Sequence, residues 1–111
     1  MQNLSITYPA DAELAAPVHI GAVSSGDLEI VATPRTGQAD ASVALRTSVD
    51  GFDVVWRRVL DRFFGEHALR AHYEINDFGA TPGMVALRLF QVQEAAREAA
   101  DAIAAGAAGA R

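Results

Sequence analysis

The chain has no cysteine, no lysine and no apolar run long enough to cross a bilayer. Without cysteine it has no disulfide framework, no thiolate metal site and no cysteine nucleophile. Its nine basic residues are all arginine, and its net charge at pH 7 is −5. An acidic chain without a basic cluster is a poor candidate for binding nucleic acid or an anionic membrane surface. The first residues lack the pattern of a signal peptide, so we expect a cytoplasmic protein.

Length and hydrophobic content predict one folded domain over residues 1–111, because half of the 111 residues are hydrophobic. Several stretches alternate apolar and polar residues with the period of two that is typical of half-buried strands. The predicted strands cover residues 4–8, 17–23, 28–33, 42–47 and 71–77. Between them, residues 11–16 and 34–40 are predicted to be connections, and residues 24–27 a tight turn.

Two helices are predicted from apolar residues spaced three and four apart. The first covers residues 52–64, with Asp50 as the expected N-cap and Gly65 as the expected stop. Its aromatic stripe suits core packing against a sheet better than a binding surface. The second starts at Thr81 and Pro82, although alternation at positions 85, 87 and 89 leaves a strand hairpin open. Residues 104–111 are rich in alanine and glycine and are expected to fray.

The resulting fold class is α+β, in the order β-β-β-β-α-β-α. We expect a mainly antiparallel sheet of about five strands with both helices packed on one face.

Residues that could perform chemistry are sparse. His19, His67 and His72 show no metal-ligand spacing, and a surface or structural role suits each better. No phosphate-binding glycine loop follows a strand, and the serines lack the flanking glycines of a hydrolase elbow. Asp27 and Glu29 lie two residues apart and would share one face of a strand, and an exposed acidic strand edge explains this pair without a catalytic role. The sequence therefore predicts neither an enzyme active site nor a metal site.

The turn at Ser24-Ser25-Gly26-Asp27 admits two interpretations. Serine, glycine and aspartate are ordinary turn residues. Alternatively, a hydroxyl at a hairpin tip could enter the active site of a modifying enzyme, with Gly26 removing a side chain that would obstruct the approach. Composition alone leaves a carrier and a small interaction domain without a prosthetic group both open.

Two segments carry a family resemblance. Val23, followed by residues 25–29 (Ser-Gly-Asp-Leu-Glu), resembles the attachment motif of the malonate decarboxylase acyl carrier protein, the delta subunit. Residues 77–83, Asp-Phe-Gly-Ala-Thr-Pro-Gly, resemble a second and more specific segment of that family. The resemblance covers about residues 3–95. A weaker similarity extends to the citrate lyase acyl carrier (gamma) subunit, which stays an alternative.

The resemblance implies a non-catalytic carrier subunit of a multi-subunit decarboxylase. Ser25 would carry 2′-(5″-phosphoribosyl)-3′-dephospho-CoA through a phosphodiester, and the thiol of this arm would hold acetyl or malonyl while malonate is converted to acetate and CO₂. The implied partners are a prosthetic-group transferase, a malonyltransferase, an acetyl/malonate carrier-transferase subunit and carboxylase-like decarboxylase subunits. A chain made in a heterologous host is expected to lack the arm.

Some residues depart from the family pattern or have two interpretations. Ser24 stands where the family is expected to have glycine. Asp27 and Glu29 are candidates for recognition by partners, with solubility as the alternative. The segment from Asp77 to Gly79 matches the family, and shaping the turn before the second helix is its favoured role. The Asp-Ser-Leu motif and the all-helical pattern of fatty-acid carriers are both absent.

Overall fold

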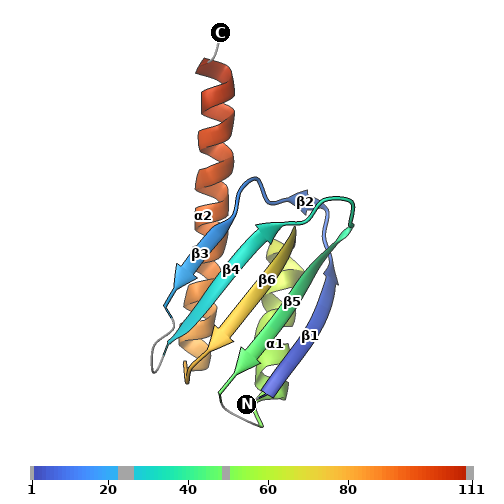
Figure 1. Cartoon of the computed structure of the whole chain (residues 1–111), viewed down its shortest axis with the longest axis vertical. Helices are drawn as coiled ribbons and strands as arrows, with labels where there is room; N and C mark the ends of the chain where they lie inside the picture. The colour runs from blue at the N-terminus through green and yellow to red at the C-terminus, as the bar shows by residue number, and fades with distance from the viewer. Residues whose placement is uncertain (1, 23–26, 49–50, 110–111) are drawn as a thin grey trace.

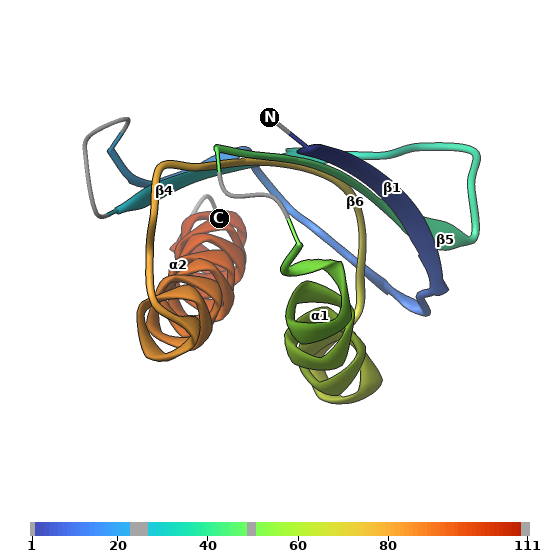
Figure 2. The same cartoon turned by 90° about the horizontal axis from the view of Figure 1, so that it is seen from below.

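The structure is a computed structural model that describes residues 2–22, 27–48 and 51–109. Its elements, in chain order, are β1 (Gln2–Pro9), β2 (Ala12–Glu13), β3 (Val18–Gly21), β4 (Leu28–Pro34), β5 (Asp40–Thr47), α1 (Asp53–His67), β6 (Leu69–Asp77) and α2 (Pro82–Gly109). The main sheet has the strand order β1-β5-β6-β4-β3, and β2 pairs with β6 off this path (Figure 1). Both helices lie on the same face of the sheet (Figure 2). The α+β class and the element order are as predicted, with β2 added.

The sheet is antiparallel except at two places, where β5 and β2 each run parallel to β6. Parallel neighbours need a crossover connection, and α1 supplies it between β5 and β6. As a result β6 lies between β4 and β5, with Leu28 of β4 and Thr47 of β5 both opposite Asp77. The carboxyl ends of β5 and β6 therefore meet at the end of the sheet where β4 begins.

The core forms where alternate strand residues meet the helices. The buried hydrophobic side chains of β4, β5 and β6 are Leu28, Ile30, Ala32, Ala41, Val43, Leu45, Ala71, Tyr73 and Ile75. From α1, Trp56, Leu60 and Phe64 are buried against them. The ring of Phe64 stacks on Tyr8 and meets Tyr73 edge-on, with centroid distances of 4.6 and 4.9 Å. Burying side chains of this size stabilises the fold by about 1.5–3 kcal/mol each, so these residues hold α1 on the sheet.

The second helix begins as predicted, and the strand-hairpin alternative is wrong. Pro82 is the first helical residue, and the Thr81 hydroxyl accepts a hydrogen bond from the Met84 N–H at 3.2 Å. The helix continues to Gly109, through much of the segment expected to fray, and its last part projects beyond the sheet (Figure 1). Alanine favours helix strongly enough to offset the two glycines there. Within the described ranges, no helix has the length and apolarity to span a membrane.

Three local predictions were wrong. Residues 11–16 were predicted to be a plain connection, but Ala12 and Glu13 pair with Leu69 and Arg70. Gly65 does not end α1, because the helix runs on to His67. A glycine costs a helix only about 1 kcal/mol, which the buried face of α1 outweighs. The cap position before α1 is occupied by Phe52, without a side-chain cap. The predicted cap Asp50 and the predicted strand end Val23 lie outside the described residues.

Candidate functional site

The connection between β3 and β4, residues 22–27, is called the β3–β4 segment below. Ser24, Ser25 and Gly26 lie outside the described residues, and the structure describes the two ends of the segment, Ala22 and Asp27. The last pair between β3 and β4 joins Gly21 to Glu29. The segment therefore leaves the sheet at the end where β6 finishes and α2 begins (Figure 1).

Gly21 fixes the point at which the chain leaves β3. Its φ of 85° lies in the left-handed region, and a Cβ atom built there would collide with the carbonyl oxygen of Leu28. Only glycine meets both conditions without strain. The sequence analysis did not single out Gly21. The available signal was a glycine two residues before Val23, where the predicted strand was expected to end.

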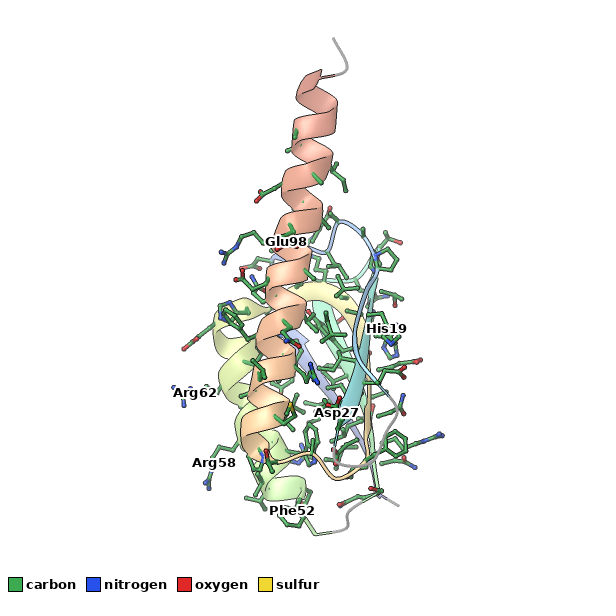
Figure 3. The ribbon with its side chains drawn as sticks, turned by 90° about the vertical axis from the view of Figure 1, so that its left-hand side faces the viewer. His19, Asp27, Phe52, Arg58, Arg62 and Glu98 are labelled. Carbon is green, nitrogen blue, oxygen red and sulfur yellow. The ribbon has the colours of Figure 1, made fainter. Side chains whose placement is uncertain are left out.

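Asp27 closes the other end of the segment through an ion pair with α2. The Arg88 Nε donates to Oδ1 at 3.1 Å, and Nη2 donates to Oδ2 at 3.0 Å. The Leu28 N–H also donates to Oδ1, at 2.7 Å, and the Phe78 N–H donates to the Asp27 carbonyl oxygen at 2.9 Å. The hydrogen bonds from Arg88 and Leu28 lower the pKa of Asp27 below its ordinary value of 3.8. Figure 3 shows Asp27 between the sheet and α2.

Glu29 is also engaged within the chain. Its Oε2 lies 3.0 Å from His19 Nε2, and its Oε1 accepts a hydrogen bond from the Asn76 side chain at 3.3 Å. With Asp27 paired to Arg88, both acidic residues that were candidates for partner recognition have partners in their own fold. These contacts support a positioning role for both carboxylates, while recognition by another protein stays a prediction.

The motif at residues 77–83 builds the turn beside the β3–β4 segment. Asp77 is 3% exposed and Thr47 is fully buried. Asp77 Oδ2 accepts a hydrogen bond from the Thr47 hydroxyl at 2.7 Å, and Oδ1 accepts one from the Ala80 N–H at 2.9 Å. Gly79 has a φ of 96°, which favours glycine. The favoured interpretation, that Asp77 to Gly79 shape this turn, agrees with these contacts.

One cluster has the residue types of a hydrolytic triad. The Ser42 hydroxyl lies 2.7 Å from His72 Nδ1, and His72 Nε2 lies 3.7 Å from Glu74 Oε1. The cluster lies on the uncovered face of β5 and β6, which each have a neighbouring strand on both sides. Their N–H groups are therefore used in strand pairing rather than being available to stabilise an oxyanion. We interpret the cluster as structural.

The other two histidines also lie beside carboxylates. His19 pairs with Glu29, and His67 lies 3.7 Å from Glu66. Among the residues that the structure describes, no group of three or more histidine and acidic side chains could hold a metal ion.

Comparison with known proteins gives consistent matches. Residues 15–98 match the family described as "Malonate decarboxylase delta subunit (MdcD)". The malonate decarboxylase acyl carrier protein of Burkholderia cepacia is 42% identical over 94 residues, covering 82% of this chain and 86% of that protein. The carrier of the same name from Pseudomonas fluorescens is 39% identical over 92 residues, covering 82% of this chain and 92% of that protein.

A solved structure has the same fold. A chain in the crystal structure of a Pseudomonas malonate decarboxylase hetero-tetramer in complex with malonate superposes with a TM-score of 0.80. The two chains are 36% identical, and the match covers 86% of this chain and 99% of the other.

Proposed function

Because this chain belongs to the malonate decarboxylase delta subunit family, we propose that it is the acyl carrier subunit of a malonate decarboxylase, with Ser25 as the attachment point of its prosthetic arm. The observation that carries the proposal is the extent of the family match. Residues 15–98 include Ser25, the 77–83 motif and Arg88. The relatives quoted above are malonate decarboxylase carriers, which favours this role over the citrate lyase alternative.

The described surroundings of Ser25 fit a covalently attached arm. Ala22, at one end of the β3–β4 segment, is small and exposed, so it leaves space for a bulky substituent. At the other end the carboxylate of Asp27 is already paired with Arg88. A phosphodiester on Ser25 would therefore not meet an unpaired carboxylate at this position. When bound, a phosphoribosyl-dephospho-CoA arm supplies a thiol that holds acyl groups as thioesters.

The residues of the chain then have a positioning role. Gly21 and the ion pair between Asp27 and Arg88 fix both ends of the β3–β4 segment to the sheet and to α2. A fixed tether raises the local concentration of what it carries at each partner active site. Such a subunit needs an accessible serine and docking surfaces, and no catalytic side chain of its own.

Intact-mass measurement tests the attachment. The chain is incubated with the prosthetic-group transferase and its activated precursor, beside Ser25→Ala and the matched control Ser24→Ala. We expect wild type and Ser24→Ala to gain the mass of the arm, and Ser25→Ala to stay unmodified. An adduct lost only in Ser24→Ala would move the attachment point by one residue. No adduct on any chain would contradict the carrier role.

A further inference from the structure

Two adjoining cavities lie between α1 and α2; the first reaches the end of β6 at Asp77, and the second is lined by the two helices alone. The first, about 270 Å³, lies between the starts of the two helices, and the second, about 410 Å³, lies farther along them. Val59 lines both cavities, which are therefore neighbours, and together they are called the interhelical furrow below. Its α1 wall includes Val55 and Phe63, and its α2 wall includes Ala86 and Phe90.

The furrow includes part of the α1 apolar stripe, which the sequence pattern assigns to the core. The buried residues of α1 are Trp56, Leu60 and Phe64. The same apolar stripe continues beyond the sheet contact, and Phe52 remains 48% exposed. On the facing helix, Phe90 is 55% exposed. Single exposed apolar residues are common, but a continuous apolar furrow with an aromatic side chain in each cavity is typical of an interaction surface.

The outer edge of the furrow carries two arginines and one glutamate, Glu66, which lines the second cavity and lies 3.7 Å from His67 on the same helix. Arg62 lines the second cavity, and Arg58 lies one turn before it on α1. Figure 3 shows both side chains on the outer side of α1, pointing away from the sheet. No carboxylate in the described ranges forms an ion pair with either arginine, whereas Arg88 and Arg97 each have one. Counting Glu66, the two arginines leave this edge with an excess of positive charge, in a chain whose net charge is −5.

The spacing of the wall residues indicates what shape fills the furrow. Val55, Val59 and Phe63 lie four residues apart on α1, and Ala86 and Phe90 lie four apart on α2. Ridges at this spacing on two neighbouring helices form a groove that accepts the apolar face of a third helix. We propose that the interhelical furrow binds an amphipathic helix of another decarboxylase subunit, with acidic residues on the edge that faces Arg58 and Arg62.

A second copy of this chain is a poorer occupant. Two furrows facing each other would place Arg58 and Arg62 against their own copies, and like charges at an interface oppose association. Each copy also carries a net charge of −5. A helix with an apolar face and carboxylates along one edge would pack against the apolar walls and form ion pairs with Arg58 and Arg62. This inference rests on the proposed function only in assuming that the chain is a subunit of a larger complex.

The test measures binding to the other decarboxylase subunits separately from attachment of the arm to Ser25. The full-length chain is titrated into the assembly formed by the other decarboxylase subunits, by calorimetry at several salt concentrations. Phe90→Glu tests the apolar wall, and the double variant Arg58→Glu, Arg62→Glu tests the charged edge. Val54→Glu on α1 is the matched apolar control, because Val54 is 63% exposed and lines neither cavity. Arg46→Glu, on the exposed face of β5, is the charge control.

We expect Phe90→Glu and the arginine double variant to weaken docking by at least about tenfold, as hot-spot residues do. The double variant also loses part of the salt dependence, while both controls dock like wild type. A photo-crosslinking residue at position 90 is expected to capture a helix that carries carboxylates on one edge.

Unchanged affinity of the furrow variants, or equal weakening by the controls, would overturn the proposal. So would capture of a non-helical or basic segment, or a wild-type dimer that Phe90→Glu separates while docking is unchanged. The arm mass on Ser25 is measured on the same variants and should not change. Failure of docking and failure of attachment are therefore distinguishable.

Discussion

Replacing Thr47 by valine removes a buried hydrogen bond that holds the turn after β6. Valine keeps the shape of threonine but lacks the hydroxyl, which donates to Asp77 Oδ2 at 2.7 Å. Thr47 is fully buried and Asp77 is 3% exposed, so no solvent replaces the lost donor. Asp77 would keep its bond from the Ala80 N–H but leave Oδ2 without the threonine donor.

A hydrogen bond to a charged group contributes about 1.5–3 kcal/mol, and an unpaired buried acceptor costs a similar amount. We therefore expect Thr47→Val to lower the free energy of unfolding by about 2–3 kcal/mol. The matched control Thr47→Ser keeps the hydroxyl and loses one buried methyl group, which costs about 1 kcal/mol. With a denaturant slope of about 1–3 kcal/mol per molar urea, Thr47→Val should move the urea midpoint down by about 1 M or more.

Equal or smaller destabilisation by Thr47→Val than by Thr47→Ser would refute this reasoning. A double-mutant cycle with Asp77→Asn gives a second check, because residues in one hydrogen-bond network are not additive. We expect the double variant to lose less stability than the sum of the two single losses. Strict additivity would show that the two side chains do not act on each other.

Two further predictions concern the ends of the β3–β4 segment. Gly21→Ala should destabilise the fold at least twice as much as Gly37→Ala in thermal unfolding. Both positions have a left-handed φ, which costs a residue with a Cβ about 1–2 kcal/mol, but only at Gly21 would the new Cβ collide with backbone atoms. Equal losses of stability in the two variants would contradict this. Arg88→Gln should lower the melting temperature near neutral pH, and its difference from wild type should shrink as the pH falls below 3.8. The reason is that a lowered pKa of Asp27 gives stability that is complete above the ordinary value and lost on acidification. The exposed pair of Arg97 and Glu94 provides the control variant Arg97→Gln, and a difference that grows on acidification would contradict the assignment.

Period-two alternation placed the long strands because one face of the sheet is buried and the other is open. The pattern does not specify strand order, so the parallel pairing of β5 with β6 became visible only in the structure. The two-residue strand at Ala12 was not predictable either, since two residues are too short to show a period. The end of α1 was misplaced because burial of Leu60 and Phe64 outweighs the local preference of Gly65.

The site was predictable only in part. The resemblance assigned Ser25 and the 77–83 segment from residue identity, and that assignment of Ser25 stays a prediction. Nothing in the sequence linked Asp27 to Arg88, which lie 61 positions apart. The whole apolar stripe of α1 was assigned to the core, although Phe52 is 48% exposed, because periodicity shows which residues share a stripe and not how much of that stripe the sheet covers.

The central position of β6 has a consequence for biosynthesis. β4 and β5 pair with β6 and not with each other. A nascent chain that ends before residue 69 can therefore form the β1–β5 pair and the β3–β4 pair, but it lacks the central strand that joins them. The ribosome must release most of the domain before the sheet can close, and Arg88 must emerge before Asp27 gains its partner. The ion pair that fixes one end of the β3–β4 segment, which contains Ser25, therefore forms late in synthesis. A transferase that recognises the folded β3–β4 segment would attach the prosthetic arm only after the domain has folded.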